Sequence, residues 1–266
     1  MLEKARKFWW IFILVLVVFS GLGLRMLVKR IDYFNLRQID IVIEGQNKLT
    51  QKKIAKWANV RYGQNIFSID LKALQQRLQE HPWIKHAFIS RKLPDELFIK
   101  VVEEKPIAMV SYKDQIYLVD QAGRIFAQIN QEDPVDLAYL QEVPGLAGLS
   151  KEEFSQGHLA PYKKPILDLL VRLKKKEGMV PCYANISQIN FLKDGFVLMT
   201  RDKIRIKLKG NNLSEILYAY RRLDKLINFL YQRKLYSRVK MIRLDYPKNE
   251  NKQDQAAIVF RKDGHG

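Results

Sequence analysis

Hydrophobic residues are concentrated in one run near the N-terminus, residues 8–24, which contains no charged side chain. A helix rises about 1.5 Å per residue, so this run is close to the minimum length that crosses a hydrocarbon core of about 30 Å. Basic residues flank the run on both sides, and Trp9 and Trp10 lie at one end, where indole rings favour the membrane interface. The pattern predicts a retained membrane anchor.

Two other interpretations of this run stay open. A cleavable signal peptide has the same basic start, although Gly21-Leu22-Gly23 is a poor cleavage site. A buried core helix is flanked by other structure, whereas only seven residues precede this run. The two flanks carry similar numbers of Lys and Arg, so charge alone does not choose the orientation in the membrane.

Beyond the run, the hydrophobic pattern breaks into short amphipathic segments. Isoleucines alternate with polar residues from Ile39, which predicts a half-buried strand. Two short helices follow, the first capped by Thr50 and the second by Ser68 or Asp70. The order strand, helix, helix, strand, strand predicts a small α+β domain over residues 36–104. Its strands are expected at residues 39–44, 84–90 and 97–102.

Residues 105–262 predict a larger, strand-rich β domain with flanking helices. One helix begins at Pro165, and a longer one begins after Asn212 and runs to about Tyr236. Residues 130–160 contain several Pro and Gly residues and are expected to be loop-like. The strands are expected at residues 115–120, 124–128, 186–192, 196–200, 203–209, 239–246 and 256–261. The fold class is therefore α+β, with a single N-terminal transmembrane helix.

The charge balance adds a constraint on partners. The chain has 46 Lys and Arg against 28 Asp and Glu, a formal net charge of +18. Such an excess favours an anionic neighbour: lipid head groups, a cell-wall polymer or nucleic acid. Cys182 is the only cysteine, so no disulfide within the chain holds the fold.

Five basic residues recur at every second position in one predicted strand. Alternation places them on one face, with Ile204, Ile206 and Leu208 on the other. This face fits the solvated side of an antiparallel sheet, a contact with anionic lipid or wall polymer, or nucleic acid. No aromatic residue lies among the cations, which weakens single-strand binding by stacking, and no nucleic-acid partner is expected. The five residues are Arg201, Lys203, Arg205, Lys207 and Lys209.

No motif typical of catalysis is present in the sequence. The four histidines and the single cysteine lack metal-ligand spacing, and no phosphate-binding loop or nucleophile motif occurs. Glu103 and Glu104 are adjacent, so in a strand they point to opposite faces, and we interpret them as a solvated pair at a domain edge. We therefore expect a protein that is not an enzyme, with no cofactor and no metal.

Aromatic residues lie at the ends of the last two predicted strands, at Tyr246 and Phe260. Two interpretations stay open. Both residues belong to the core, or the outer strand offers an unpaired edge to which a partner adds a strand.

Short motifs follow one another through the first half of the chain. They are residues 41–47 (IVIEGQN), 63–70 (GQNIFSID), 82–84 (PWI), 91–97 (RKLPDEL), 102–108 (VEEKPIA), 118–126 (LVDQAGRIF) and, more loosely, 143–148 (VPGLAG). No single motif is decisive, but their order and spacing resemble the FtsQ/DivIB family of bacterial cell-division proteins.

The resemblance implies a domain layout and a role. The layout is a cytoplasmic tail (1–7), the anchor (8–24), a linker (25–35), a POTRA domain (36–104), a β domain outside the cytoplasm (105–262) and a tail (263–266). The role is that of a non-enzymatic scaffold in the cell (inner) membrane at the division septum. The implied partners are FtsB and FtsL, small bitopic proteins that bind the β domain, and other divisome proteins that bind the POTRA domain.

The resemblance also implies a partner site, because in the family a partner segment adds along the last strands of the β domain. The residues expected to form it are Leu244, Tyr246, Ala256, Ala257, Ile258 and Phe260. Two features depart from the family pattern. The loop over residues 247–255 is longer and more polar than the usual tight hairpin, and the cytoplasmic tail (1–7) is short. Two other functions stay open: a POTRA-bearing envelope protein for transport or assembly, and an envelope protein that binds anionic polymer through the Arg201–Lys209 face.

Overall fold

The computed structural model describes residues 32–45, 48–130, 132–175, 178–193, 195–245 and 255–261. The predicted anchor, Tyr246 and most of the polar loop after it lie outside these residues. None of the described helices combines the length and the apolar composition that are needed to cross a bilayer. The chain divides between Glu104 and Lys105 into two compact units, which we call unit 1 and unit 2 and describe separately.

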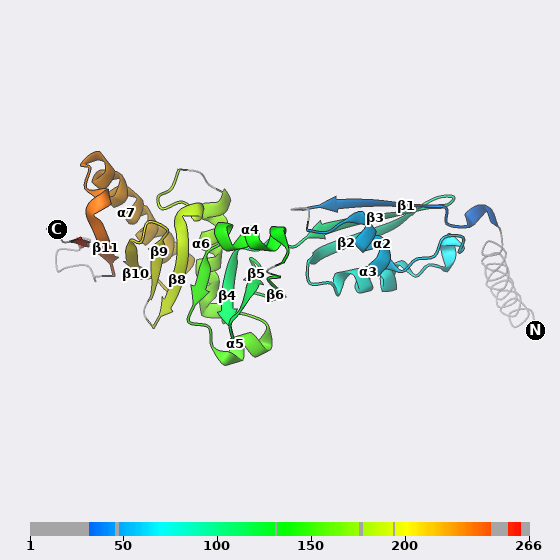
Figure 1. Cartoon of the computed structure of the whole chain (residues 1–266), viewed down its shortest axis with the longest axis horizontal. Coiled ribbons are helices and arrows are strands. Elements are labelled where there is room, and N and C mark those ends of the chain that lie inside the picture. Colours follow the sequence, from blue (N-terminus) through cyan, green and yellow to red (C-terminus); the bar gives the residue numbers. More distant parts are fainter. Residues whose placement is uncertain are drawn as a thin grey trace, which may run out of the picture. The chain divides into compact units, whose positions relative to one another are not determined.

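Unit 1 is a three-stranded sheet with two helices packed on one face (Figure 1). The strand order is β1-β3-β2, with β1 parallel and β2 antiparallel to the central β3. The predicted βααββ order is confirmed. The elements are β1 Gln38–Glu44, α2 Gln51–Ala58, α3 Leu71–Gln79, β2 Ile84–Lys92 and β3 Glu96–Glu103, with 3-10 turns η1 Asp32–Phe34 and η2 Ile66–Ser68.

Caps and apolar stripes explain why these helices form where they do. The Thr50 hydroxyl accepts a hydrogen bond from the third amide of α2, and the Asp70 carboxylate accepts two amide hydrogen bonds at the start of α3. Each cap satisfies amides that have no partner inside the helix. Leu74 and Leu78 lie one turn apart and are buried against the sheet, which stabilises the unit by roughly 2 kcal/mol for each leucine.

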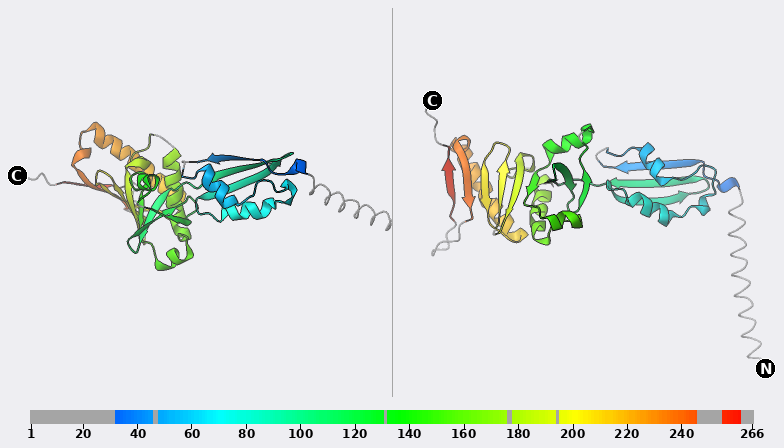
Figure 2. Two further views of the ribbon diagram at one scale, coloured as in Figure 1. Left: turned by 45° about the vertical axis from the view of Figure 1, so that its right-hand side comes forward. Right: turned by 60° about the horizontal axis from the view of Figure 1, so that its bottom comes forward.

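Unit 2 is a nine-stranded sheet in the order β12-β11-β10-β9-β8-β7-β4-β5-β6. The β4–β7, β7–β8 and β10–β11 pairs are parallel and the other pairs are antiparallel. Helices α6 and α7 pack on each other and bury apolar stripes against the sheet (Figures 1 and 2). The strands are β4 Ala108–Tyr112, β5 Gln115–Val119, β6 Ile125–Gln128, β7 Gly145–Ala147, β8 Ile186–Leu192, β9 Gly195–Thr200, β10 Arg205–Leu208, β11 Val239–Leu244 and β12 Ala257–Phe260. The helices are α4 Pro134–Glu142, α5 Lys151–Gln156, α6 Lys164–Lys175 and α7 Leu213–Gln232, with 3-10 turns η3 Pro161–Lys163, η4 Tyr183–Asn185 and η5 Tyr236–Arg238.

The prediction that residues 130–160 are loop-like is wrong. This stretch contains α4, β7 and α5. Strand β4, which precedes β5 and β6, also has no counterpart among the predicted strands. Strand β7 is three residues long, too short to show alternation, and the apolar residues of α4 do not gather on one face. Helix α5 spans less than two turns and is held by a reciprocal capping box between Ser150 and Glu153.

Candidate functional site

The last strand, β12, ends the sheet of unit 2. It pairs antiparallel with β11, with Ala257 opposite Arg243 and Ile258 opposite Ile242. Within the described part of the chain, no strand pairs with its other side. Figure 2 shows β12 (red) outside β11 (orange) at the end of the sheet. An unpaired edge presents backbone N–H and C=O groups that can pair with another chain.

The predicted partner-site residues differ widely in exposure. Phe260 is 40% exposed and its neighbour Val259 is 45% exposed, so neither is a core residue. Ala256 is exposed, whereas Ala257 and Ile258 are half-buried. Leu244 is 4% exposed and belongs to the core of β11, so its side chain is not available to a partner. Tyr246 lies outside the described residues.

An ion-pair cluster fixes the end of β11. The Lys207 Nζ lies 2.9 Å from the Asp245 Oδ2, and the Arg243 guanidinium donates to both Asp245 oxygens at 3.2 Å. Partial burial acts to raise the pKa of Asp245, but the hydrogen bonds from Arg243 and Lys207 outweigh it and lower the pKa to about 2. The carboxylate is therefore ionised at neutral pH and ties β11 to its parallel neighbour β10.

Backbone contacts hold the two ends of β12. The Arg222 Nη2 donates to the Gln255 carbonyl at 3.1 Å, before the strand begins. After it ends, the Arg261 amide donates to the Arg238 carbonyl at 2.7 Å, and the Arg261 Nη2 donates to the Asp202 carbonyl at 3.1 Å. The edge strand is therefore positioned by contacts that do not use its outer side.

The predicted strand face of five cations is only partly present. Strand β10 begins at Arg205, whereas Arg201 lies in a turn and Lys203 has a left-handed backbone with φ of 68°. The Arg201 Nε donates to the Ala184 carbonyl at 2.6 Å. Alternation fails there because a single left-handed residue redirects the chain before the strand starts. Of the five, Arg205 and Lys207 lie in β10, and Lys207 pairs with Asp245.

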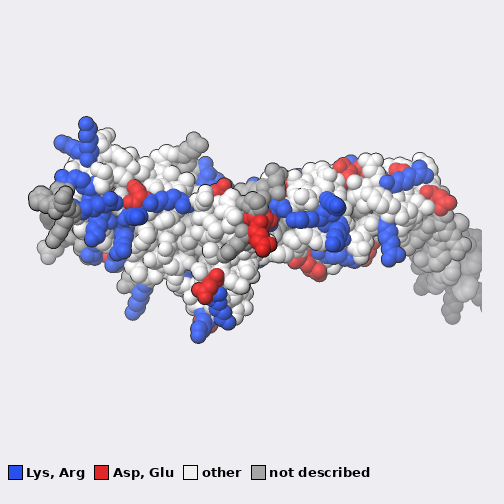
Figure 3. Space-filling view, viewed as in Figure 1, with Lys and Arg blue, Asp and Glu red and all other residues white. Residues whose placement is uncertain are grey.

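Positive charge nevertheless dominates this end of unit 2. Residues 201–261 contain 16 Lys and Arg against 6 Asp and Glu. Figure 3 shows Lys and Arg gathered over the part of unit 2 that carries α7 and β11. The β12 edge therefore lies in a region of positive potential, which favours an anionic or acidic partner.

Glu103 and Glu104 are not the solvated pair that was expected, because they are 1% and 4% exposed. The Leu49 amide donates to the Glu103 Oε1 at 2.5 Å, and the Lys85 Nζ lies 3.5 Å from the Glu104 Oε1. Both carboxylates are thus held inside unit 1. Among the described residues, no group of three or more His, Cys, Asp or Glu is arranged to hold a metal ion.

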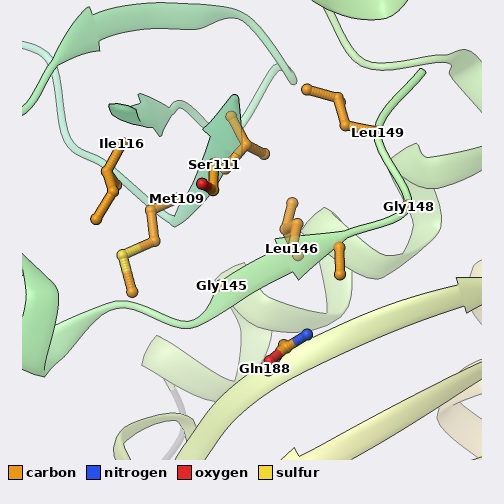
Figure 4. A pocket seen from close by; sticks show the side chains of 10 residues that line it. Met109, Ser111, Ile116, Gly145, Leu146, Gly148, Leu149 and Gln188 are labelled. Atoms are coloured by element: carbon orange, nitrogen blue, oxygen red, sulfur yellow. The ribbon is translucent and has the colours of Figure 1, made fainter. Parts of the chain in front are cut away.

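A hollow of about 380 Å³ lies over β7, beside β4 and β8 (Figure 4). Figure 4 shows side chains from these strands around it, among them Met109, Leu146 and Gln188. None of the residues that line it is acidic, basic, His or Cys. The Ser111 hydroxyl is the one nucleophile type in the lining, and no lining residue could act as the general base that a serine nucleophile needs. Sequence reasoning missed it because a three-residue strand between longer neighbours leaves no signal in the hydrophobic pattern.

Comparison with known proteins identifies the first unit. Residues 34–104 match the family described as POTRA domain, FtsQ-type. A "Cell division protein FtsQ" of Rickettsia bellii is 34% identical over 84 residues, which are 32% of this chain and 32% of the relative. A protein of the same name from Syntrophotalea carbinolica is 29% identical over 142 residues, 53% of this chain and 46% of the relative.

A longer match extends into unit 2. A "Cell division protein FtsQ" of Geotalea daltonii is 25% identical over 215 residues, which are 78% of this chain and 70% of the relative. The chain spans about a third to a half of the length of the first two relatives. The family model covers only residues 34–104, within unit 1, whereas the match of 215 residues is longer than unit 1 and therefore includes part of unit 2.

Proposed function

This chain belongs to the FtsQ family of bacterial cell-division proteins, and we propose that it is a non-enzymatic scaffold of the divisome. In this proposal residues 1–7 are a cytoplasmic tail, residues 8–24 anchor the chain in the cell (inner) membrane, and residues 25–35 link the anchor to the POTRA domain. The POTRA domain and the β domain lie outside the cytoplasm at the septum. The POTRA domain recruits other divisome proteins, and the β domain binds FtsB- and FtsL-type bitopic proteins.

The observation that carries the proposal is the outer side of β12, with which no other strand of the described residues pairs in the sheet of nine strands. A partner strand that adds there gains backbone hydrogen bonds, while Val259 and Phe260 offer apolar surface for specificity. Asp245 and the contacts at Gln255 and Arg261 hold the edge in place before any partner arrives. Such a preformed edge lowers the ordering cost of binding.

The test compares Phe260→Ala with Leu192→Ala in the full chain. Leu192 is 44% exposed at the end of β8, which lies inside the sheet, so it matches Phe260 in exposure but not in position. Two quantities are measured for each variant. The first is the amount of FtsB- and FtsL-type protein, from the same organism, that the membrane-bound chain captures. The second is the melting temperature of the chain. Loss of an aromatic anchor costs about 2 kcal/mol or more, which is roughly thirtyfold in binding.

We expect Phe260→Ala to weaken capture at an almost unchanged melting temperature, and Leu192→Ala to leave both unchanged. Tyr246 is a partner-site residue by the family resemblance, and we expect Tyr246→Ala to weaken capture in the same way as Phe260→Ala. Equal capture by the two variants, Phe260→Ala and Leu192→Ala, would show that β12 is not the partner site. A large drop in melting temperature for Phe260→Ala would assign that side chain to stability instead.

A second candidate function rests on the charge of residues 201–261. An envelope protein that binds anionic polymer uses such a surface, and its binding weakens steeply with salt. Capture of FtsB- and FtsL-type proteins by backbone pairing weakens far less. Binding of anionic polymer and capture of FtsB- and FtsL-type proteins, each measured at low and at high salt, therefore separate the two functions.

A further inference from the structure

Exposed aromatic and apolar side chains gather at the end of unit 1 where the described chain begins. Tyr33 is 62% exposed, Tyr62 is 66% exposed and Leu93 is 60% exposed. They come from three separate segments: the turn η1, the loop that follows α2, and the turn between β2 and β3. Exposed apolar side chains that are scattered singly need no explanation, but those that gather on one surface mark an interaction site.

Backbone hydrogen bonds bring the three segments together. The Leu36 amide donates to the Gln64 carbonyl, and the Gly63 amide donates to the Leu36 carbonyl, both at 2.9 Å. The Arg37 amide donates to the Asp95 carbonyl at 2.9 Å, which joins the start of β1 to the β2–β3 turn. Figure 1 shows η1, the loop after α2 and the β2–β3 turn at the same end of unit 1. Tyr33, Tyr62 and Leu93 thus belong to one surface, which we call the aromatic end.

The aromatic end is built on ordered packing. The Phe34 ring makes edge contacts with Tyr33 and Phe67, at centroid distances of 5.3 and 5.2 Å. The Arg91 guanidinium lies 5.9 Å from the Phe67 centroid and donates to the carbonyls of Ile66 and Ile69 at 2.8 and 2.6 Å. The exposed rings are therefore held on a fixed base.

The sequence limits what this end can face. Seven residues, 25–31, separate the apolar run from Asp32. A fully extended chain of that length spans at most about 25 Å. If residues 8–24 are in the membrane, the aromatic end stays within that reach of the bilayer surface. Tyrosine has an apolar ring and a polar hydroxyl, and it is enriched at the membrane interface for that reason.

We infer that the aromatic end of unit 1 docks on the lipid surface, with Tyr33, Tyr62 and Leu93 inserted among the head groups. The inference rests on the proposed anchor at residues 8–24. The docked end sets the angle between unit 1 and the membrane surface. The short linker and the surface contact together restrict the orientation of unit 1, which a linker alone would leave free.

The test uses the full chain in vesicles of phosphatidylcholine and phosphatidylglycerol that contain head-group spin-labelled lipid. Cys182 is exposed and is first replaced by Cys182→Ser. One fluorophore is then attached through Tyr62→Cys, Leu93→Cys or Tyr162→Cys in separate samples. Tyr162 is the matched reference, because it is 65% exposed but lies in unit 2. We expect the spin-labelled lipid to quench the labels at positions 62 and 93 several-fold more strongly than the label at position 162.

A second arm asks whether the rings themselves hold the contact. With the label at position 93, the double variant Tyr33→Ser and Tyr62→Ser should lose most of the quenching, and Tyr162→Ser should lose none. Equal quenching at positions 62, 93 and 162 in a chain that floats with the vesicles overturns the inference and leaves the anchor standing. A chain that does not float with the vesicles refutes the anchor and the inference together. Labels that are shielded only after FtsB- and FtsL-type proteins are added assign the surface to a protein and also overturn it.

Discussion

Replacing Lys163 by Met should destabilise unit 2 more than any surface charge change near it. Lys163 is completely buried, and its Nζ donates to the Glu153 Oε2 at 2.6 Å and to the Gly148 carbonyl at 2.7 Å. Removing one partner of a buried ion pair costs about 3–5 kcal/mol, because the other charge stays buried. We expect the lower end, about 3 kcal/mol, since Glu153 still accepts from the amides of Ser150 and Ala160.

Amide hydrogen exchange on the full chain measures this loss within one unit. A factor of ten corresponds to about 1.4 kcal/mol, so protection around β7, α5 and α6 should fall by about a hundredfold while β1–β3 stay unchanged. Lys164→Met is the matched control. Its side chain is 44% exposed and pairs with Asp168 at the surface, so its loss should cost no more than about 1 kcal/mol. Equal effects of Lys163→Met and Lys164→Met would refute the reasoning.

The same pair predicts a pH dependence. Burial acts to raise the pKa of Glu153, but hydrogen bonds from Lys163, Ser150 and Ala160 outweigh it and hold the pKa below its ordinary value. A carboxyl group whose pKa is lower when folded stabilises the protein above the unfolded pKa of about 4.3, and this stability is lost as the pH falls through the folded pKa. The difference in the free energy of unfolding between Lys163→Met and the unchanged chain should therefore become smaller below about pH 4.

Three further changes test separate contacts. Asp245→Asn should lower the stability of β10–β12 by about 2 kcal/mol at neutral pH. This loss should vanish as the pH falls from about 4 to about 2, because the pKa of Asp245 is lowered to about 2, and hydrogen exchange during acid unfolding measures the loss. Gly45→Ala should destabilise unit 1 by about 1–3 kcal/mol in thermal unfolding, because the added Cβ overlaps the Glu103 side chain, and a smaller loss than that of Ala55→Gly would contradict it. Gly195→Ala should weaken the β9–β10 pair, seen as faster exchange of its amides, because its φ is 142° and a Cβ would overlap the Leu208 carbonyl.

Unit 1 could be predicted element by element because its signals are local. Thr50 and Asp70 are capping residues placed before apolar stripes of helical spacing, and Ile39 begins a clear alternation. Each of these signals lies within a few residues of the element that it predicts. The burial of Glu103 and Glu104 could not be predicted. For Glu103 it depends on the absent side chain of Gly45 and on the Leu49 amide, both more than fifty positions away in the chain, and the Glu104 carboxylate lies 3.5 Å from Lys85 on strand β2.

The prediction for the middle of unit 2 was wrong for the opposite reason, because the strands there are defined by partners that are distant in the sequence. Among the described strands, β7 pairs with β4 and β8, which lie about forty residues away on either side, and three residues carry no pattern of their own. Strand formation depends on such neighbours more than on intrinsic preference. The cation face failed at Lys203, where a left-handed residue interrupts an alternation that looks continuous in the sequence.

The edge strand β12 shows how far the hydrophobic pattern can locate the proposed partner site. Leu244 and Phe260 are both apolar residues near the ends of neighbouring strands, yet one is 4% exposed and the other 40%. Nothing local distinguishes them, because the difference comes from the sheet order that places β11 inside and β12 outside. A site that binds through backbone groups needs no particular side chain at most positions. Its location is therefore encoded in which strand comes last, and the consequence is testable: mutations along β12 should affect capture unequally, with Phe260 dominant and Ala257 nearly neutral.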